Sequence, residues 1–192
     1  SVRALCVARH RFLSEHLGVW FGAVGIDCSL AVGLDGAVAA AAVQPPDVVI
    51  CEYDLLATGS LEEWERVMAI NVRGPFLVTR AVLPLLRAAG GGARVLGIGS
   101  VMARRGAAGM LHYATSKAAL EGFTRALARE LAPDGITANV VVPSLVRTET
   151  AERLYPGAEE EAVPEQLVPR HQEPDDLVPL LCFLASPESG WT

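Results

Sequence analysis

Short apolar runs alternate with helical stretches along most of the sequence, and this alternation constrains the fold more than any other feature. Such runs are typical of strands in a parallel sheet that helices cover on both faces. The predicted strands span residues 2–8, 27–32, 47–51, 94–98 and 136–142. The predicted helices span residues 13–24, 36–43, 60–70, 76–89, 113–131 and 175–185. We therefore predict an α/β fold with a doubly wound parallel sheet in three α/β/α layers.

Local signals set several of these boundaries. Ser60 and Glu63 have the spacing of a capping box, in which each side chain bonds the backbone N–H of the other residue at the start of a helix. Two prolines at 45–46 end the helix before them, and residues 133–135 (Pro-Asp-Gly) form a turn. The polar, acidic segment 148–169 is predicted to form a mobile loop or short helices.

The length and composition favour one globular domain that spans residues 1–192. About half of the residues are apolar and a fifth are charged, and we find neither an internal repeat nor a linker. The net charge is −6 without a block of Lys or Arg, so we expect no nucleic-acid partner. No segment approaches 18 uncharged apolar residues, so we expect no membrane span. Arg9 and Arg11 would break the apolar region of a signal peptide, which favours a cytoplasmic protein.

The cysteine and histidine positions indicate neither disulfides nor a metal site. The four cysteines form no CxxC pair, and the first three lie in apolar strand-like runs; they are Cys6, Cys28, Cys51 and Cys182. We interpret them as buried free thiols of a cytoplasmic protein. The four histidines, at positions 10, 16, 112 and 171, have no metal-ligand spacing, so we expect no bound metal.

Three polar features follow one another in the order of the predicted elements. Asn71 follows the first of two successive helices, and Ser100 follows the fourth strand. Tyr113 and Lys117 lie at the start of the next helix, four residues apart and therefore on one face. Catalytic groups of open α/β sheets gather at the carboxyl ends of strands, where Ser100 would lie.

Tyr113 and Lys117 have a chemical interpretation as an acid–base pair. A tyrosine with a pKa near 10 is a poor acid–base catalyst at neutral pH, but a neighbouring ammonium lowers that pKa. Tyr113 would then move a proton to or from a carbonyl or alcohol oxygen, which contributes about 10²–10⁴ in rate. Ser100 would hydrogen-bond the same oxygen. Each feature alone has a structural explanation (an exposed helix turn, a strand-end turn, a helix-ending Asn), whereas the three in this order favour catalysis.

The segment 47–185 resembles the short-chain dehydrogenase/reductase family. The stretches that carry the resemblance are EEWERVMAINVRGPF (62–76), ARVLGIGSVMARRG (93–106), YATSKAALEGFTRALARELAPDGITANVVVP (113–143) and EPDDLVPLLCFLAS (173–186). The resemblance implies a Rossmann-like fold and hydride transfer between NAD or NADP and an alcohol or ketone. It implies that Ser100, Tyr113 and Lys117 are catalytic and that Asn71 helps to hold a water in a proton relay.

The resemblance also implies positions for a cofactor and for a partner subunit. Lys117 corresponds to the family's lysine that binds the nicotinamide ribose, and Pro143 and Thr148 match positions beside the nicotinamide. The helices 71–89 and 113–131 correspond to the family's dimer core. We therefore expect a homo- or hetero-oligomer with subunits of the same fold.

The predicted cofactor-binding half departs from the family pattern. The family has a Gly-rich turn, GxxxGxG, which allows close backbone approach to a pyrophosphate. All three glycines are replaced here, by Ala8, Phe12 and Ser14, and the Phe12 ring would stand where phosphates approach. Gly33 stands where a carboxylate or an Arg selects NAD or NADP, and Asp35 is the nearest acid.

Further departures shorten the predicted sheet. About one βα unit, roughly 30 residues, is missing between residues 32 and 47, near the N-terminus. The residues Cys-Glu-Tyr-Asp at 51–54 replace the family's Asn-Asn-Ala-Gly, and Pro143 is followed by Ser144 in place of Gly. The sequence ends at residue 192, where family members continue into a final strand.

Three functions fit this combination. The slightly favoured one is a short-chain oxidoreductase with weakened or altered nicotinamide binding, in which 148–169 is the substrate lid and the substrate is not predicted. Arg9 and Arg11 would attract a phosphate at a helix N-terminus, although a solvated basic turn is the favoured interpretation. The second function is a non-catalytic subunit that supports an active paralogue in a hetero-oligomer. The third, ranked well below, is cofactor-independent chemistry as in halohydrin dehalogenases, which carry Arg at the position of Lys117.

Overall fold

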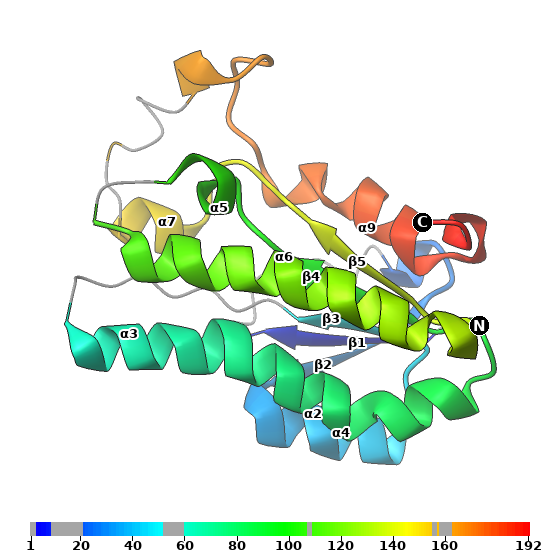
Figure 1. Ribbon diagram of the computed structural model, residues 1–192. Coiled ribbons are helices and arrows are strands. Elements are labelled where there is room, and N and C mark those ends of the chain that lie inside the picture. Colours follow the sequence, from blue (N-terminus) through cyan, green and yellow to red (C-terminus); the bar gives the residue numbers. More distant parts are fainter. Residues whose placement is uncertain (1–2, 9–20, 52–59, 107–108, 155–156, 158–162) are drawn as a thin grey trace.

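Five parallel strands form one sheet in the residues that the computed structural model describes, which are 3–8, 21–51, 60–106, 109–154, 157 and 163–192 (Figure 1). The strands lie in the order β2-β1-β3-β4-β5. Their bounds are Arg3–Ala8 for β1, Asp27–Val32 for β2, Val48–Cys51 for β3, Arg94–Ile98 for β4 and Thr137–Val141 for β5. All the predicted strands are therefore present, and each neighbouring pair is parallel.

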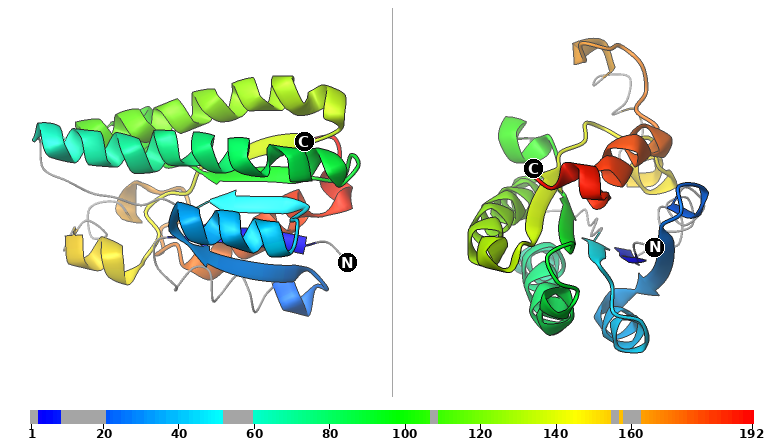
Figure 2. Two further views of the ribbon diagram at one scale, coloured as in Figure 1. Left: turned by 90° about the horizontal axis from the view of Figure 1, so that it is seen from below. Right: turned by 90° about the vertical axis from the view of Figure 1, so that its right-hand side faces the viewer.

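Two apolar clusters, one on each face of the sheet, produce the three layers (Figure 2). The helices of the first face are α2 (Gly33–Val43), α4 (Gly74–Ala88) and α6 (Leu111–Leu131). The second face is covered by α9 (Val178–Ala185) together with Phe21. Strand side chains alternate between the two clusters. The predicted α/β/α architecture is confirmed.

The sheet is shortened on the side of β2. The residues between β2 and β3 form α2 and no further strand, so α2 alone carries the chain across β1. Leu30 and Val32 of β2 are 44% and 57% exposed, as expected for the outermost strand. The predicted loss of one βα unit is therefore confirmed. α2 begins three residues earlier than predicted, because Gly33 has a left-handed φ of 72° that turns the chain directly from β2 into the helix.

One helical run spans Leu61–Ala88, and it contains α3 (Leu61–Met68), a π-helical turn η1 (Ala69–Arg73) and α4. The predicted capping box begins it: the Glu63 N–H donates to Ser60 Oγ at 3.2 Å, and the Ser60 N–H donates back to Glu63 Oε2 at 3.5 Å. In the described part of the chain this is the one helix long and apolar enough to cross a membrane. A helix that packs on a sheet passes the same test, so this is weak evidence of a span.

Short helical segments make up most of the rest. The sequence does not predict α5 (Met102–Arg105), because four residues cannot show a helical period. The segment 148–169 contains α7 (Glu149–Leu154) and the turn η3 (Val163–Glu165), in line with the predicted short helices. The last predicted helix is divided into a 3₁₀ turn η4 (Pro174–Asp176) and α9. Two more 3₁₀ turns are η2 (Ala132–Asp134) and η5 (Pro187–Ser189).

The strand order places a switch point between β1 and β3. The chain moves outward from β1 to β2 and then returns to the other side of β1 as β3. Ligands of open α/β sheets bind outside the carboxyl ends of the strands at such a point. Residues 9–20 and 52–59, which follow β1 and β3, lie outside the described residues. The described part of this edge is therefore formed by the ends of β2, β4 and β5.

Candidate active site

The carboxyl ends of β4 and β5 bring Ser100 and Pro143 together. The Val101 N–H donates to the Pro143 carbonyl at 3.0 Å, just beyond the end of the β4–β5 ladder. Gly99 allows this close approach, because a Cβ at that position would lie 3.1 Å from Val140 Cγ2. Both Ser100 and Pro143 are buried. The packing of the two strand ends therefore favours glycine at position 99, and the next residue, Ser100, places a hydroxyl group there.

The first turn of α5 orients the Ser100 hydroxyl. The Met102 N–H donates to Ser100 Oγ at 3.2 Å, and the Ala103 N–H donates to the Ser100 carbonyl at 3.0 Å. Because the hydroxyl oxygen accepts the bond from Met102, its own hydrogen can point towards another acceptor. Ser100 is thus held as a hydrogen-bond donor at the sheet edge.

Tyr113 and Lys117 lie one turn apart on the buried face of α6. Tyr113 is 8% exposed and Lys117 is 2% exposed, so this pair is not an exposed helix turn. Lys117 Nζ lies 5.5 Å from the centroid of the Tyr113 ring and donates to the Ile98 carbonyl at 3.1 Å. Ile98 ends β4, two residues before Ser100. The bond therefore brings the ammonium to the strand end that carries the serine.

Asn71 lies within a helical run and not at a helix end. It belongs to η1, where the Gly74 N–H bonds to the Ala69 carbonyl five residues back. Pro75 has no N–H to offer to the Asn71 carbonyl, four residues back, so an ordinary α-helical ladder cannot form there. The wider π turn lets the helix continue past this proline. The predicted break between two helices is wrong for this reason.

A buried hydrogen-bond chain joins Asn71 to α6. Asn71 Nδ2 donates to Ser116 Oγ at 2.9 Å, and the Ser116 hydroxyl donates to the Tyr113 carbonyl at 2.7 Å. Asn71 Oδ1 is buried and has no hydrogen-bond partner among the described residues. An unpartnered buried acceptor costs about 1–3 kcal/mol. Asn71 is therefore placed to accept a bond from a further donor, at a cost in stability.

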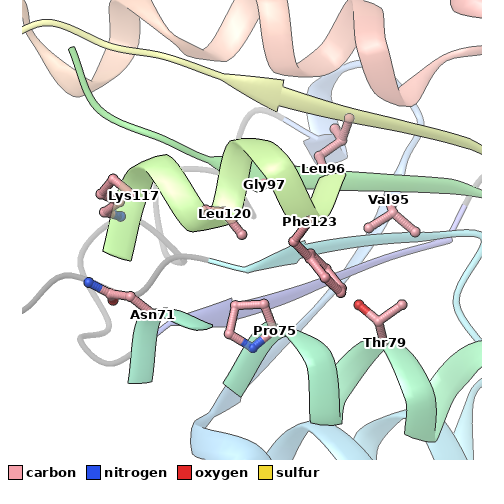
Figure 3. A pocket seen from close by; sticks show the side chains of 9 residues that line it. All are labelled: Asn71, Pro75, Thr79, Val95, Leu96, Gly97, Lys117, Leu120 and Phe123. Carbon is pink, nitrogen blue, oxygen red and sulfur yellow. The ribbon is translucent and has the colours of Figure 1, made fainter. Parts of the chain in front are cut away.

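A cavity of about 20 Å³ lies between α4, β4 and α6 (Figure 3). Lys117 and Asn71 line one end of it, and its other walls are mostly apolar, with Pro75, Leu120 and Phe123 among them (Figure 3). A cavity of this size has room for about one water molecule. The ammonium of Lys117 and the amide of Asn71 thus border the same small space.

The sequence analysis missed Ser116 and the ion pair that joins α5 to α6. Arg104 Nη2 lies 3.3 Å from Glu121 Oε2, and Arg125 Nη1 lies 3.6 Å from the same oxygen. Glu121 is 7% exposed, so the Arg104 contact holds α5, and with it the Ser100 strand end, against α6. The sequence pattern that could have indicated both residues is their helical spacing from Tyr113. Ser116 and Glu121 lie three and eight residues after it and therefore on the same, largely apolar face of the helix.

Thr148 lies at the start of α7, five residues beyond Pro143. Its Oγ accepts a bond from the Ala151 N–H at 3.1 Å, and its carbonyl accepts one from the Glu152 N–H at 2.9 Å. The Thr148 hydroxyl therefore caps the N-terminus of α7. This structural role is independent of the predicted contact between Thr148 and a cofactor. Gln172 holds the segment that follows β5, because its Oε1 accepts a hydrogen bond from the Ser144 N–H at 2.9 Å.

The side chains of Lys117, Tyr113 and Ser100 could hold the nicotinamide end of a cofactor, because a buried ammonium, a phenol and a serine hydroxyl form a donor set for ribose and carbonyl oxygens. Most of the positions that the family pattern assigns to the pyrophosphate lie outside the described residues. The positions that lie outside the described residues there are Arg9, Arg11, Phe12, Ser14 and 52–54, with the side chain of Ala8. Among the described residues, no group of three or more His, Cys, Asp or Glu side chains could hold a metal ion.

Comparisons with known proteins show which family and which relatives the chain resembles. Residues 29–192 match the family model described as enoyl-(acyl carrier protein) reductase. The chain is 35% identical over 154 residues to the (3R)-3-hydroxyacyl-CoA dehydrogenase of Mus musculus, across 77% of this chain and 59% of that protein. It is 35% identical over 161 residues to dehydrogenase/reductase SDR family member 4 of Pongo abelii, across 83% of this chain and 55% of that protein.

A solved structure shows the same fold. It is a 3-ketoacyl-(acyl-carrier-protein) reductase from Brucella melitensis complexed with NADH. The match has a TM-score of 0.86 at 21% identity and covers 100% of this chain and 93% of that chain. The chain spans less than two thirds of the length of the two curated relatives named above, which are 59% and 55% covered.

Proposed function

The chain belongs to the short-chain dehydrogenase/reductase family, and from this premise we propose that it is an oxidoreductase that interconverts an alcohol and a ketone with NAD or NADP. The observation that carries the proposal is the Lys117 ammonium, which lies beside the Tyr113 ring and bonds the strand end that leads to Ser100. Burying a charge at 2% exposure is costly. A role in packing does not account for that cost, whereas acid–base chemistry does.

The side chains divide the acid–base work among them. When bound, a nicotinamide cofactor donates or accepts a hydride. In the reducing direction, the Tyr113 hydroxyl gives its proton to the carbonyl oxygen of the substrate, and the Lys117 ammonium stabilises the phenolate that remains. Ser100 donates a hydrogen bond to the same oxygen as its charge grows. Asn71 helps to hold a water near Lys117, through which Tyr113 regains a proton.

Lys117, Pro143 and Thr148 would hold the nicotinamide end of the cofactor, and we propose that the adenine end binds weakly or in an altered way. Gly33 follows β2 directly and offers no side chain to a ribose or phosphate. The nearest acid, Asp35, lies in the exposed first turn of α2. The sequence replacements at Ala8, Phe12 and Ser14 support the same view.

Thermal melting with saturating NADH or NADPH tests this proposal. A ligand at 100 times its Kd adds about 2.7 kcal/mol, so we expect the melting temperature to rise by about 5–10 °C. Reduced nicotinamide mononucleotide, which lacks the adenine half, is the matched ligand. At the same concentration as NADH it should give a similar rise if Lys117 and Pro143 provide most of the binding.

The absence of any rise at millimolar NADH and NADPH would contradict the oxidoreductase proposal. It would support the second candidate, a non-catalytic subunit of a hetero-oligomer. The observation that favours this candidate is an exposed helical surface, formed by α3, α4 and α6, that carries separate large apolar side chains. α3 and α6 run side by side with their first residues at the same end (Figures 1 and 2), and those residues, Leu61 and Leu111, are each 74% exposed. Phe76, in the first turn of α4, is 48% exposed.

We propose that a second copy of this chain covers that surface in the isolated protein. Exposed large apolar groups on adjoining helices are typical of a subunit interface. Sedimentation equilibrium should give at least twice the 20.3 kDa mass of one chain. Phe76→Glu should reduce the mass to that of one chain, whereas Val43→Glu, at an 89% exposed position of α2, should not. A single-chain mass for the unsubstituted protein would exclude the homo-oligomer.

A further inference from the structure

Two cysteines on neighbouring strands have their sulfur atoms in contact. Cys6 Sγ in β1 and Cys28 Sγ in β2 are 3.2 Å apart. Ala4 is the register partner of Cys28, and Cys6 lies two residues beyond Ala4, so the three side chains project from one face of the sheet. Both cysteines pack in the apolar cluster that α9 covers. They belong to no part of the catalytic machinery proposed above.

The two thiols differ in their access to solvent. Cys6 is 2% exposed, as predicted, whereas Cys28 is only half-buried, contrary to the prediction of a buried thiol. The reason is the position of β2, which is the outermost strand of the described sheet. A small solute can therefore reach Cys28 before it reaches Cys6.

The contact also changes the acidity of Cys28. The hydrogen bond from the Cys6 thiol lowers the pKa of Cys28 below its ordinary value, although burial and the charge of Asp27 act in the opposite direction. Cys182 in α9 is the contrasting case, because burial raises the pKa of its thiol. The thiolate is the nucleophilic form of cysteine. Cys28 should therefore react faster than Cys182 at neutral pH.

We propose that Cys6 and Cys28 form a redox-active pair, which hydrogen peroxide oxidises to a disulfide between β1 and the edge strand β2. The Cys28 thiolate attacks one peroxide oxygen, the O–O bond breaks, and Cys28 becomes a sulfenic acid as hydroxide leaves. The Cys6 thiol then attacks the Cys28 sulfur, the S–S bond forms, and the S–O bond breaks with loss of water. In total the two thiols lose two electrons and two protons, and one peroxide is reduced to two water molecules.

The two cysteines are diagonal across the strand pair, since Cys28 pairs with Ala4 and Cys6 with Leu30, so the bond requires β2 to shift along β1. A disulfide is about 2.0 Å long, so the sulfur atoms must approach by about 1 Å. Among the described strands β2 pairs with β1 alone, and an edge strand can shift more easily than one bonded on both sides. The bond would close the chain between residues 6 and 28. A closed loop of this length restricts the unfolded state, so the oxidised protein should melt about 5–10 °C higher.

Peroxide treatment of the whole chain, followed by mass spectrometry under non-reducing conditions, tests the proposal. We expect the loss of two hydrogen atoms and a fall from four titratable thiols to two in the denatured chain. Digestion with trypsin and an Asp-specific protease separates the four cysteines into peptides 4–9, 27–34, 47–53 and 176–192, so a 4–9/27–34 crosslink identifies the pair. Cys182→Ser is the matched control and should keep the crosslink.

Single substitutions separate the two steps. Cys6→Ser keeps a hydroxyl donor beside Cys28 and should leave Cys28 as a sulfenic acid that dimedone captures, whereas Cys28→Ser should leave Cys6 unmodified by the same dose. Circular dichroism and melting of each variant show that it is folded. Four remaining thiols after treatment would overturn the proposal, as would a crosslink that joins any other pair of peptides. None of these readouts depends on the proposed oxidoreductase activity.

Discussion

Replacement of Tyr113 by phenylalanine is expected to lower the turnover of alcohols and ketones by about 10²–10⁴-fold, the usual contribution of a positioned acid–base group. The substitution removes one hydroxyl and keeps the ring, which is 8% exposed and packs beside Lys117. The Ser116 bond to residue 113 uses the backbone carbonyl, so it is unaffected. The melting temperature should therefore change little while kcat falls.

A matched variant on the same helix shows whether the loss of any buried hydroxyl lowers activity or only the loss of the Tyr113 hydroxyl. Thr124→Val removes a buried hydroxyl that bonds only the Leu120 carbonyl of its own helix, at 2.8 Å. It should keep most of the activity. If Tyr113→Phe retained activity within a few-fold of the unsubstituted protein, Tyr113 would not be the proton donor. If both variants lost activity equally, the effect would belong to the packing of α6.

Much of the fold can be predicted from the sequence, because the signals are local. Each strand is a short apolar run, and Leu120, Leu127 and Leu131, which recur at helical spacing in the predicted helix 113–131, are buried. The capping box at Ser60 depends on residues three apart. The shortened sheet also follows from counting, since residues 33–47 have length for one helix and no further strand.

The candidate site depends on contacts between residues far apart in the sequence, and a local sequence pattern cannot predict such contacts. The Asn71–Ser116 bond joins residues 45 positions apart, and the Lys117–Ile98 bond joins residues 19 apart. The π turn at η1 is similar: Gly74-Pro75 is typical of the start of a new helix, and only the packing of both halves on the same layer shows that the helix continues. The replacements of the Gly-rich turn stay predictions, because residues 9–20 lie outside the described structure.

Lys117→Met is expected to remove activity without destabilising the protein. The variant loses the cation beside Tyr113, so kcat should fall by at least about 10²-fold. Two opposing terms act on stability. The Ile98 carbonyl loses its donor, which costs about 1–3 kcal/mol. The buried ammonium disappears too, and its desolvation penalty is several kcal/mol. We therefore expect an unchanged or higher free energy of unfolding, measured by urea denaturation.

The composition of the chain indicates that position 117 requires lysine and not arginine. Lys117 is the only lysine in the sequence, and the other 15 of the 16 Lys and Arg residues are arginine. A guanidinium is a planar fork, whereas an ammonium is a compact charge that can donate to the Ile98 carbonyl beside the Tyr113 ring. A chain that uses arginine elsewhere thus has lysine where the described geometry needs the smaller cation.

The single lysine makes the test of its role direct. Incorporation of lysine labelled with ¹³C at the ε carbon gives one side-chain resonance, which should shift when NADH is added if Lys117 contacts the nicotinamide ribose. Arg129→Met removes an exposed cation from the same helix and should change neither activity nor that resonance. A Lys117→Met protein that kept its activity would exclude the acid–base role. A variant that lost several kcal/mol of stability together with activity would assign Lys117 to packing, because the hydrogen bond to Ile98 would then outweigh the cost of burying its charge.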